Sequence, residues 1–268
     1  MGKIKVKRKS TLIDMTAMSD VTVLLLTFFM LTSTFLQKEP TQVVTPPSVS
    51  TQKIQSSNVA QVLVATSAND KDTPKVYISV IGEANPDIPE EGTYGDLEPG
   101  AWGSENLRKE ILKNAIALYM ECGGKDPGIT KDDIEKFSKV ATFGVPIMKI
   151  HEFFTLDQTK QDEWLSDLDR FDSGIPLINY LNTKEKDANG NYVKTNEFQI
   201  WMRAIFNATP YDETLQTLNY KMRKTGEGIA VKADRGTSFH TVNKVLENLR
   251  TIKMNKFTVM TALKSENE

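Results

Sequence analysis

The segment of residues 17–36 constrains this chain most, because it is apolar over nearly its whole length and contains one charged residue, Asp20. A hydrocarbon core of ~30 Å needs roughly 20 helical residues, which this segment supplies. The lysines on either side, Lys9 and Lys38, would lie about 43 Å apart on a helix, close to the thickness of a bilayer with its headgroups. The sequence therefore predicts one transmembrane helix, with bounds at residues 13–36.

Asp20 lies near the middle of this predicted span. An ionised carboxylate at that depth costs roughly 2.5 kcal/mol or more, so we expect Asp20 to face protein or a water-filled pocket. Loss of solvent favours the protonated carboxyl, which makes Asp20 a candidate for binding and releasing a proton. Helical spacing places Thr16, Thr27 and Thr34 on the same side as a polar stripe. Two alternatives stay open: a signal peptide, although no A-x-A-like cleavage site follows, and a plain anchor with Asp20 at the headgroup level.

The basic residues at positions 3 to 9 lie in the N-terminal segment, residues 1–12, directly before the span. The positive-inside rule then places the N-terminus in the cytoplasm and the remaining residues outside. The formal net charge of -2 argues against a nucleic-acid partner.

Two ends of the chain resemble one family. Residues 13–21 read I-D-M-T-A-M-S-D-V and residues 24–30 read L-L-L-T-F-F-M, which resembles the N-terminal signature of the ExbD/TolR family. Residues 229–234, 242–249 and 256–261 resemble the strand, helix and strand that close the family's domain.

The resemblance implies roles for specific residues. Asp20 aligns with the proton-carrying aspartate of the family, and Asp14 aligns with a second acid on the cytoplasmic side. Thr16, Thr27 and Thr34 are accessory candidates. Ala17 stands where the family usually has proline, so the helix is expected to enter the membrane without the usual kink.

The resemblance also implies partners and a location. We expect a single-pass subunit of an inner-membrane motor, with an ExbB-like pentamer around two copies of this helix and a TonB-like protein that receives the work. The C-terminal domain would lie in the periplasm, with protons as the coupling ion and no cofactor. The alternatives are a TolR-like subunit that serves envelope integrity through Pal and peptidoglycan, and a passive anchored binding module in the lipid bilayer.

Residues 37–74 are rich in Thr, Gln, Ser and Pro, which predicts an extended linker. Residues 43–46 within it could add a short edge strand to a sheet. The remaining residues, 75–265, are expected to form an α+β domain with a small sheet and a helical insertion at about residues 104–175. That insertion resembles the one in longer ExbD variants.

Local patterns predict the elements of this domain. The expected strands are residues 76–81, 229–233 and 256–263, and the last two should pair in parallel across a right-handed crossover helix. The expected helices are residues 104–122, capped by Ser104, one that starts after Thr130, a short one at residues 145–156, and residues 196–206, which residues 211–224 extend or follow. Asn189-Gly190 is a turn signal, either for a hairpin or for a loop tip. In the crossover helix the inward residues should be Phe239, Val242, Val245, Leu246, Leu249 and Ile252.

We expect no metal site and no enzymatic centre. The acidic run at residues 162–172 departs from the calcium-loop pattern, because Phe171 occupies a ligand position and Asp172 the position of the required glycine. His151 and His240 share no ligand spacing with other donors. Cys122 has no partner for an internal disulfide, so a buried thiol is expected, with an intermolecular bridge as the alternative.

Overall fold

The computed structural model describes residues 15–32, 45, 47–48, 57–83, 103–186, 188–260 and 262–263. The chain divides into two compact units, Met1–Lys38 and Glu39–Glu268. The first unit contains the helix α1 (Met15–Thr32). Within the described residues, we find no helix with both the length and the apolar character that crossing a membrane requires.

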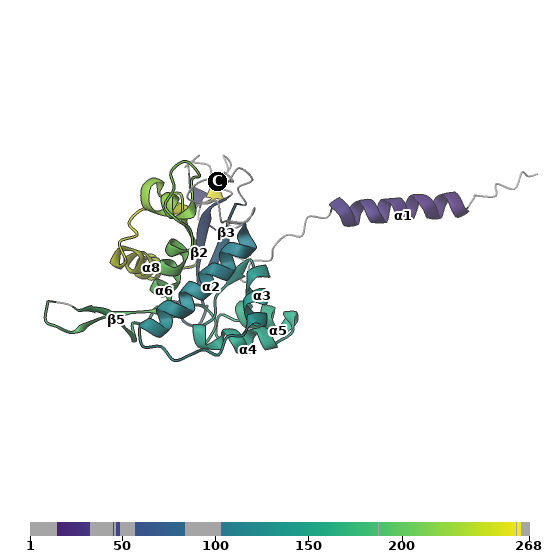
Figure 1. Ribbon diagram of the computed structural model, residues 1–268. Helices are drawn as coiled ribbons and strands as arrows, with labels where there is room; N and C mark the ends of the chain where they lie inside the picture. The colour runs from purple at the N-terminus through teal and green to yellow at the C-terminus, as the bar shows by residue number, and fades with distance from the viewer. Residues whose placement is uncertain are drawn as a thin grey trace, which may run out of the picture. The chain divides into compact units, whose positions relative to one another are not determined.

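The second unit is built on a five-stranded mixed sheet with the strand order β4-β3-β2-β7-β8. Figure 1 labels β2 and β3 of this sheet. Its strands are β2 (Val59–Thr66), β3 (Pro74–Ile81), β4 (Thr142–Phe143), β7 (Ile229–Ala233) and β8 (Thr258–Met260). The central strand β2 pairs antiparallel with β3 and parallel with β7. Strand β8 pairs parallel with β7, as predicted, and the helix α8 (Phe239–Thr251) connects the two. The predicted α+β class is therefore confirmed for this unit.

The central strand corrects one prediction. Residues 59–66 fall inside the expected linker, residues 37–74, yet they form β2, in which only Gln61 and Thr66 are not fully buried. A nearly continuous apolar run is typical of a strand that is covered on both faces. The linker prediction is wrong for these residues, because the polar composition of the longer segment hid a short apolar run.

Six further helical segments belong to this unit, and most of them begin or end close to the predicted positions. They are α2 (Ser104–Glu121), α3 (Lys131–Lys139), α4 (Ile150–Thr155), α5 (Gln158–Ser166), α6 (Glu197–Asn207) and α7 (Leu218–Tyr220). Two other turns precede α4 and follow α7: the 3-10 helix η1 (Ile147–Lys149) and the π-helix η2 (Lys221–Thr225). The sequence did not predict α5.

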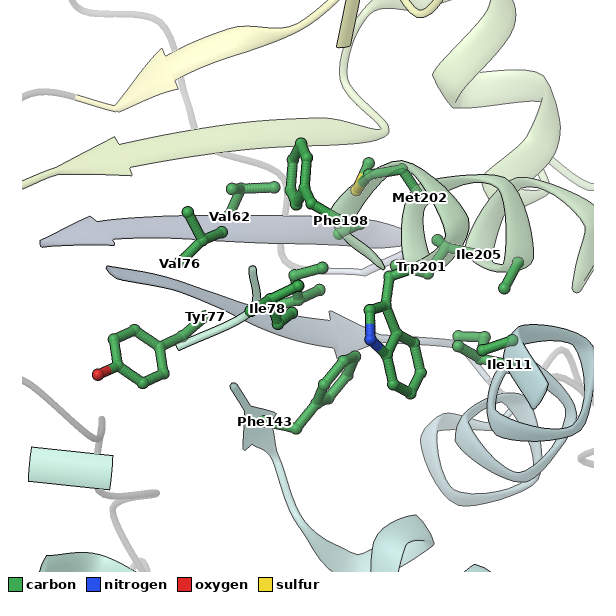
Figure 2. Close-up of a cluster of buried hydrophobic side chains, with 14 of the residues drawn as sticks. Val62, Val76, Tyr77, Ile78, Ile111, Phe143, Phe198, Trp201, Met202 and Ile205 are labelled. Atoms are coloured by element: carbon green, nitrogen blue, oxygen red, sulfur yellow. The ribbon is translucent and has the colours of Figure 1, made fainter. Parts of the chain in front are cut away.

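The core lies between one face of the sheet and α6, which packs between α2 and α8. Phe198 and Trp201 of α6 point toward Val62 and Ile78 of the sheet, and Phe143 of β4 closes the cluster (Figure 2). Each of these side chains is at most 5% exposed. Full burial of such a side chain stabilises a fold by roughly 1.5–3 kcal/mol.

Tyr77 lies on the face of the sheet opposite to α6, because side chains alternate along β3 and its neighbour Ile78 faces α6 (Figure 2). Its hydroxyl lies 2.8 Å from Ser173 Oγ and donates to the Leu165 carbonyl at 2.9 Å. Its ring lies against Gly144, where an added Cβ would come within 2.1 Å of a ring carbon. Tyr77 therefore joins this face of the sheet to the helical insertion, and Gly144 leaves room for its ring.

The capping interactions at the starts of α2 and α3 show how the sequence sets where these helices begin. Thr130 and Asp133 form a reciprocal capping box at the start of α3, as the sequence predicts. The predicted cap at Ser104 is wrong, because the N-cap of α2 is Gly103. The Ser104 hydroxyl instead donates to the Gly82 carbonyl at 3.1 Å and accepts from the Gly82 N–H at 3.0 Å, which fixes α2 to the end of β3.

Two small ladders lie outside the main sheet. The strands β5 (Leu181–Lys186) and β6 (Tyr192–Thr195) form the predicted hairpin. The strand β1 (Pro47–Ser48) pairs in parallel with β9 (Ala262–Leu263), next to the segment 43–46 that was predicted to add an edge strand. Phe239 is 78% exposed at the start of α8, so its predicted inward position is wrong.

Candidate functional site

The first candidate site is the polar side of α1. Asp20 and Thr27 are separated by about two helical turns, so they lie on one face. The Thr27 hydroxyl donates to the Leu24 carbonyl at 3.0 Å, and the Thr22 hydroxyl donates to the Ser19 carbonyl at 2.8 Å. These hydroxyls are thus satisfied by the backbone of their own helix, which allows them to lie in apolar surroundings.

Apolar side chains surround Asp20 along the helix. Val21, Val23 and Leu26 are 55%, 56% and 62% exposed, and helical spacing places them on different sides of α1. A helix with apolar side chains on most of its sides is normally covered by protein or lipid. Among the described residues, Asp20 has no ion pair or hydrogen-bond partner, so its side chain is open to a group from another molecule.

The structure describes only some of the other residues that were predicted for this site. Thr16 is on α1 four residues before Asp20 and therefore on the same side. Asp14 and Thr34 lie outside the described residues, as do the ends of the predicted span, residues 13–36. The predicted stripe of Thr16, Asp20, Thr27 and Thr34 is thus described at three of its four positions.

The second unit contains a buried carboxylate, Glu197, in the first turn of α6. Glu197 is 2% exposed. The Ile147 N–H donates to its Oε2 at 2.7 Å, and the Tyr180 hydroxyl donates to its Oε1. Burial raises the pKa of Glu197, and the two hydrogen bonds lower it by less. Burial and the contact with Glu197 likewise raise the pKa of Tyr180. This pair fixes the turn η1 to the start of α6.

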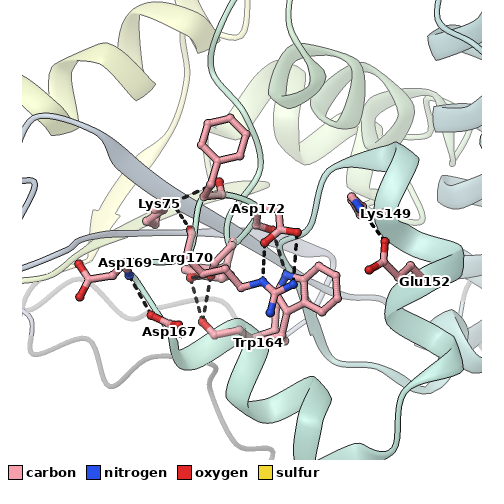
Figure 3. A network of polar contacts seen from close by, with 12 residues as sticks. Lys75, Lys149, Glu152, Trp164, Asp167, Asp169, Arg170 and Asp172 are labelled. Carbon is pink, nitrogen blue, oxygen red and sulfur yellow. Dashed lines mark hydrogen bonds and ion pairs between the residues drawn. The ribbon is translucent and has the colours of Figure 1, made fainter.

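A second polar network fixes the loop at residues 167–173 against the β2–β3 hairpin (Figure 3). The Arg170 guanidinium lies 3.7 Å from the centre of the Trp164 ring and forms an ion pair with Asp172. Lys75 donates to the Arg170 carbonyl at 2.7 Å. Asp169 accepts hydrogen bonds from Ser67 and, at 3.0 Å, from Asn69. The carboxylates of this acidic run are therefore used to anchor a loop.

No group of three or more potential metal-ligating side chains occurs among the residues that the structure describes. His151 contacts Asp133 rather than a cluster of donors. Cys122 is buried, and burial raises the pKa of its thiol.

No local pattern indicates that Glu197 and Tyr180 are partners, because the β5–β6 hairpin separates the two residues along the chain. The His151–Asp133 contact was equally hidden, although the sequence predicts that a helix starts after Thr130. Both pairs join a helix start to a neighbouring segment, and such pairs become visible only when the elements are packed.

Comparison with known proteins concerns the segment that contains the first candidate site. Residues 6–117 match the family described as biopolymer transport protein ExbD/TolR. The match includes Asp20 and all of α1, β2 and β3, and it ends inside α2. No curated protein and no solved structure matches the chain. The resemblance at residues 229–261 lies outside the match and stays a prediction, although the strand, helix and strand are present.

Proposed function

We infer from the membership of residues 6–117 in the ExbD/TolR family of biopolymer transport proteins that this chain is an ExbD-like subunit of a motor driven by the proton-motive force. The observation that carries the proposal is the family match across Asp20, the carboxylate on an otherwise apolar helix. The motor would lie in the inner membrane and energise transport across the outer membrane.

In this proposal α1 is the membrane anchor, with the N-terminus in the cytoplasm and the second unit in the periplasm. Asp20 would alternate between a protonated and an ionised state as protons cross. Each elementary charge that moves through 100 mV contributes about 2.3 kcal/mol. Asp14, Thr16, Thr27 and Thr34 would assist as polar neighbours along the proton path.

The exposed apolar surface of α1 supports a partner for this helix. A carboxylate at membrane depth must face protein or water, and Asp20 has no hydrogen-bond or ion-pair partner among the described residues of its own chain. An ExbB-like pentamer around two copies of α1 would supply that surface. A TonB-like protein would receive the work, and protons would be the only coupling species, without a further cofactor.

The same family match suits a second candidate, a TolR-like subunit of an envelope-integrity system that contacts peptidoglycan. The two candidates share the proton chemistry at Asp20 and differ in the partner that receives the work. Deletion of the gene separates them, because loss of energised uptake indicates the first and leakage of periplasmic contents indicates the second.

The test of the proton-carrying role uses two substitutions. Asp20→Asn keeps the size of the side chain but cannot become an anion, so it should abolish energised uptake of a large substrate. Asp20→Glu keeps the titration and moves the carboxyl by one methylene, so it should retain part of the activity. The measurement is uptake in cells that lack the native gene, with recovery of the complex as the control for assembly.

Thr22→Val provides a matched control, because it changes a neighbouring polar side chain whose hydroxyl bonds to its own helix. It should leave uptake near the wild-type level. Full uptake with Asp20→Asn would remove the proton-carrying role and favour a passive anchored binding module.

A further inference from the structure

A pocket of about 630 Å³ lies where the C-terminal ends of α2, α6 and α8 meet the π-helix η2. Its floor is apolar and consists of Leu118, Phe206, Met222, Ile252 and Met254. Its cationic side chains are Arg203, Arg223, Lys253 and Lys256. Two asparagines complete the lining, which contains no carboxylate.

We propose that this pocket binds an acidic segment of a partner protein that inserts one large apolar side chain. The apolar floor would take the inserted side chain, and the four cations would pair with carboxylates on either side of it. The proposal is independent of proton transfer at Asp20, because the pocket lies in the other unit.

The charges of the pocket are not neutralised within the described part of the chain. None of its four cations forms an ion pair with a carboxylate there. Arg223 lies 5.3 Å from the centre of the Phe206 ring and 5.5 Å from that of Tyr211, which holds its guanidinium beside the floor. Lys256 donates to the Lys224 carbonyl at 2.6 Å. Arg223 and Lys256 are thus held in place without an anionic partner among the described residues.

Compensation of helix dipoles is the simpler explanation for cations near helix C-termini, and each such charge stabilises a helix by roughly 0.3–1 kcal/mol. It explains a lysine or arginine on each helix separately. It does not explain why four cations from α6, η2 and the segment after α8 converge on one apolar hollow. Convergence of polar groups on an apolar floor is typical of a ligand site.

Lys253 supplies an independent observation. Its φ is 64°, in the left-handed region that favours glycine. The Lys253 N–H donates to the Arg250 carbonyl and the Met254 N–H to the Leu249 carbonyl, both at 2.9 Å, so Lys253 occupies the position where helices usually end with glycine. A lysine is unfavourable in this backbone conformation. A role of its ammonium group in binding would explain why lysine rather than glycine occupies the position.

The geometry favours a peptide over a phosphate-bearing ligand. Phosphate sites commonly use the N–H groups at a helix N-terminus, whereas the long helices at this pocket present their C-terminal ends. The carbonyls at those ends repel a compact dianion. An extended acidic peptide can instead place single carboxylates next to separate cations and bury its apolar side chain on the floor.

The experiment measures the fluorescence anisotropy of a labelled peptide, Glu-Glu-Phe-Glu-Glu, with the purified full chain. We expect saturable binding that weakens as salt is added, because the cations are exposed. The double variant Lys253→Gly and Arg223→Gln should weaken binding at least tenfold. Lys253→Gly also relieves the backbone, and urea unfolding of the double variant checks that a loss of binding does not come from unfolding. Lys160→Gln removes a cation from α5, away from the pocket, and should leave binding unchanged.

An altered peptide and a phosphate competitor test the ligand class. A peptide with glycine in place of phenylalanine should bind at least tenfold more weakly, because the floor is then left without a partner. Equal binding of the two peptides, or displacement of both by millimolar inorganic phosphate, would overturn the proposal in favour of a small-anion site.

The chain itself offers a competing occupant, because residues 83–98 contain carboxylates and no lysine or arginine. The variant Glu90→Gln with Glu91→Gln tests it. If the probe binds only to this variant, the pocket belongs to the chain's own acidic segment and the proposed partner is overturned. Unchanged binding supports the partner.

Discussion

His151 Nδ1 lies 2.7 Å from Oδ2 of Asp133, whose side chain is 3% exposed. The same carboxylate oxygen accepts hydrogen bonds from the N–H and the hydroxyl of Thr130, both at 2.8 Å. Asp133 therefore caps the start of α3 and at the same time holds α4, which carries His151. One buried acid thus joins two helices of the insertion.

The first prediction is an acid-dependent loss of stability through Asp133. Burial raises the pKa of this carboxyl, but the hydrogen bonds with His151 and Thr130 outweigh burial and lower the pKa below 3.8. A carboxyl with a lowered pKa stabilises the fold at pH values above its unfolded-state pKa. This stabilisation is lost as the pH falls through the folded-state pKa. At pH values below 3.8, the free energy of unfolding of residues 57–263, measured in urea, should decrease less steeply for Asp133→Asn than for the wild type.

The second prediction concerns the cap itself. Asp133→Ala leaves the Thr130 N–H without its partner and should lower the free energy of unfolding by about 1–2 kcal/mol. Asp132→Ala removes a neighbouring carboxylate that forms only an exposed pair with Lys136, so its effect should be within about 0.5 kcal/mol. Equal losses for both variants would show that Asp133 has no special role.

Glu197 should show the opposite pH dependence. Its raised pKa means that the stabilisation is complete below the ordinary value of 4.5 and is lost as the pH rises through the folded-state pKa. Glu197→Gln should therefore flatten the pH profile above pH 4.5. Glu197→Ala leaves the Ile147 N–H unpaired and should cost about 1–3 kcal/mol at every pH. Glu110→Gln, an exposed control, should not alter the profile.

The fourth prediction tests where the folded unit begins. Residues 57–263 include β2, whereas residues 75–263 lack it. When β2 is absent, its neighbours β3 and β7 lose the strand that pairs with both of them. The core also loses Val62, Leu63 and Val64. The longer fragment should unfold cooperatively in urea and the shorter one should not, as followed by circular dichroism. A cooperative transition of the shorter fragment would contradict the central role of β2.

Periodic and capped elements were predictable from the sequence. Thr130 marked the start of α3, Asn189-Gly190 marked the β5–β6 hairpin, and the helix between two strands near the C-terminus predicted the parallel pair. In each case a local signal decides the local structure. Strand β2 was missed because its neutral, short apolar run lies next to a polar segment, and its burial depends on partners that are distant in the sequence.

The candidate site shows the same division. Asp20 could be predicted because a single charge in an apolar run is unusual by itself. The basic pocket could not, because Arg203, Arg223 and Lys253 belong to separate segments that only the fold brings together. Phe239 was assigned inward by helical spacing, but it occupies the first position of α8, where the helix has not yet reached the core.

The last prediction compares two buried tryptophans. Trp201 is stacked on Phe137 at 5.8 Å between ring centres, and its Nε1 has no hydrogen-bond partner among the described residues. Trp164 Nε1, in contrast, donates to the Asp172 carbonyl at 3.0 Å, and its ring lies under Arg170.

Trp201→Phe removes an unsatisfied donor and keeps an aromatic ring, so it should cost less than about 1.5 kcal/mol. Trp164→Phe loses a made hydrogen bond and weakens the cation–π contact, so it should cost more than Trp201→Phe. Trp201→Ala opens a cavity beside Phe137 and should cost about 3–5 kcal/mol. Urea unfolding of residues 57–263 measures all three. A larger loss of the free energy of unfolding for Trp201→Phe than for Trp164→Phe would contradict the view that the Trp201 N–H makes no hydrogen bond.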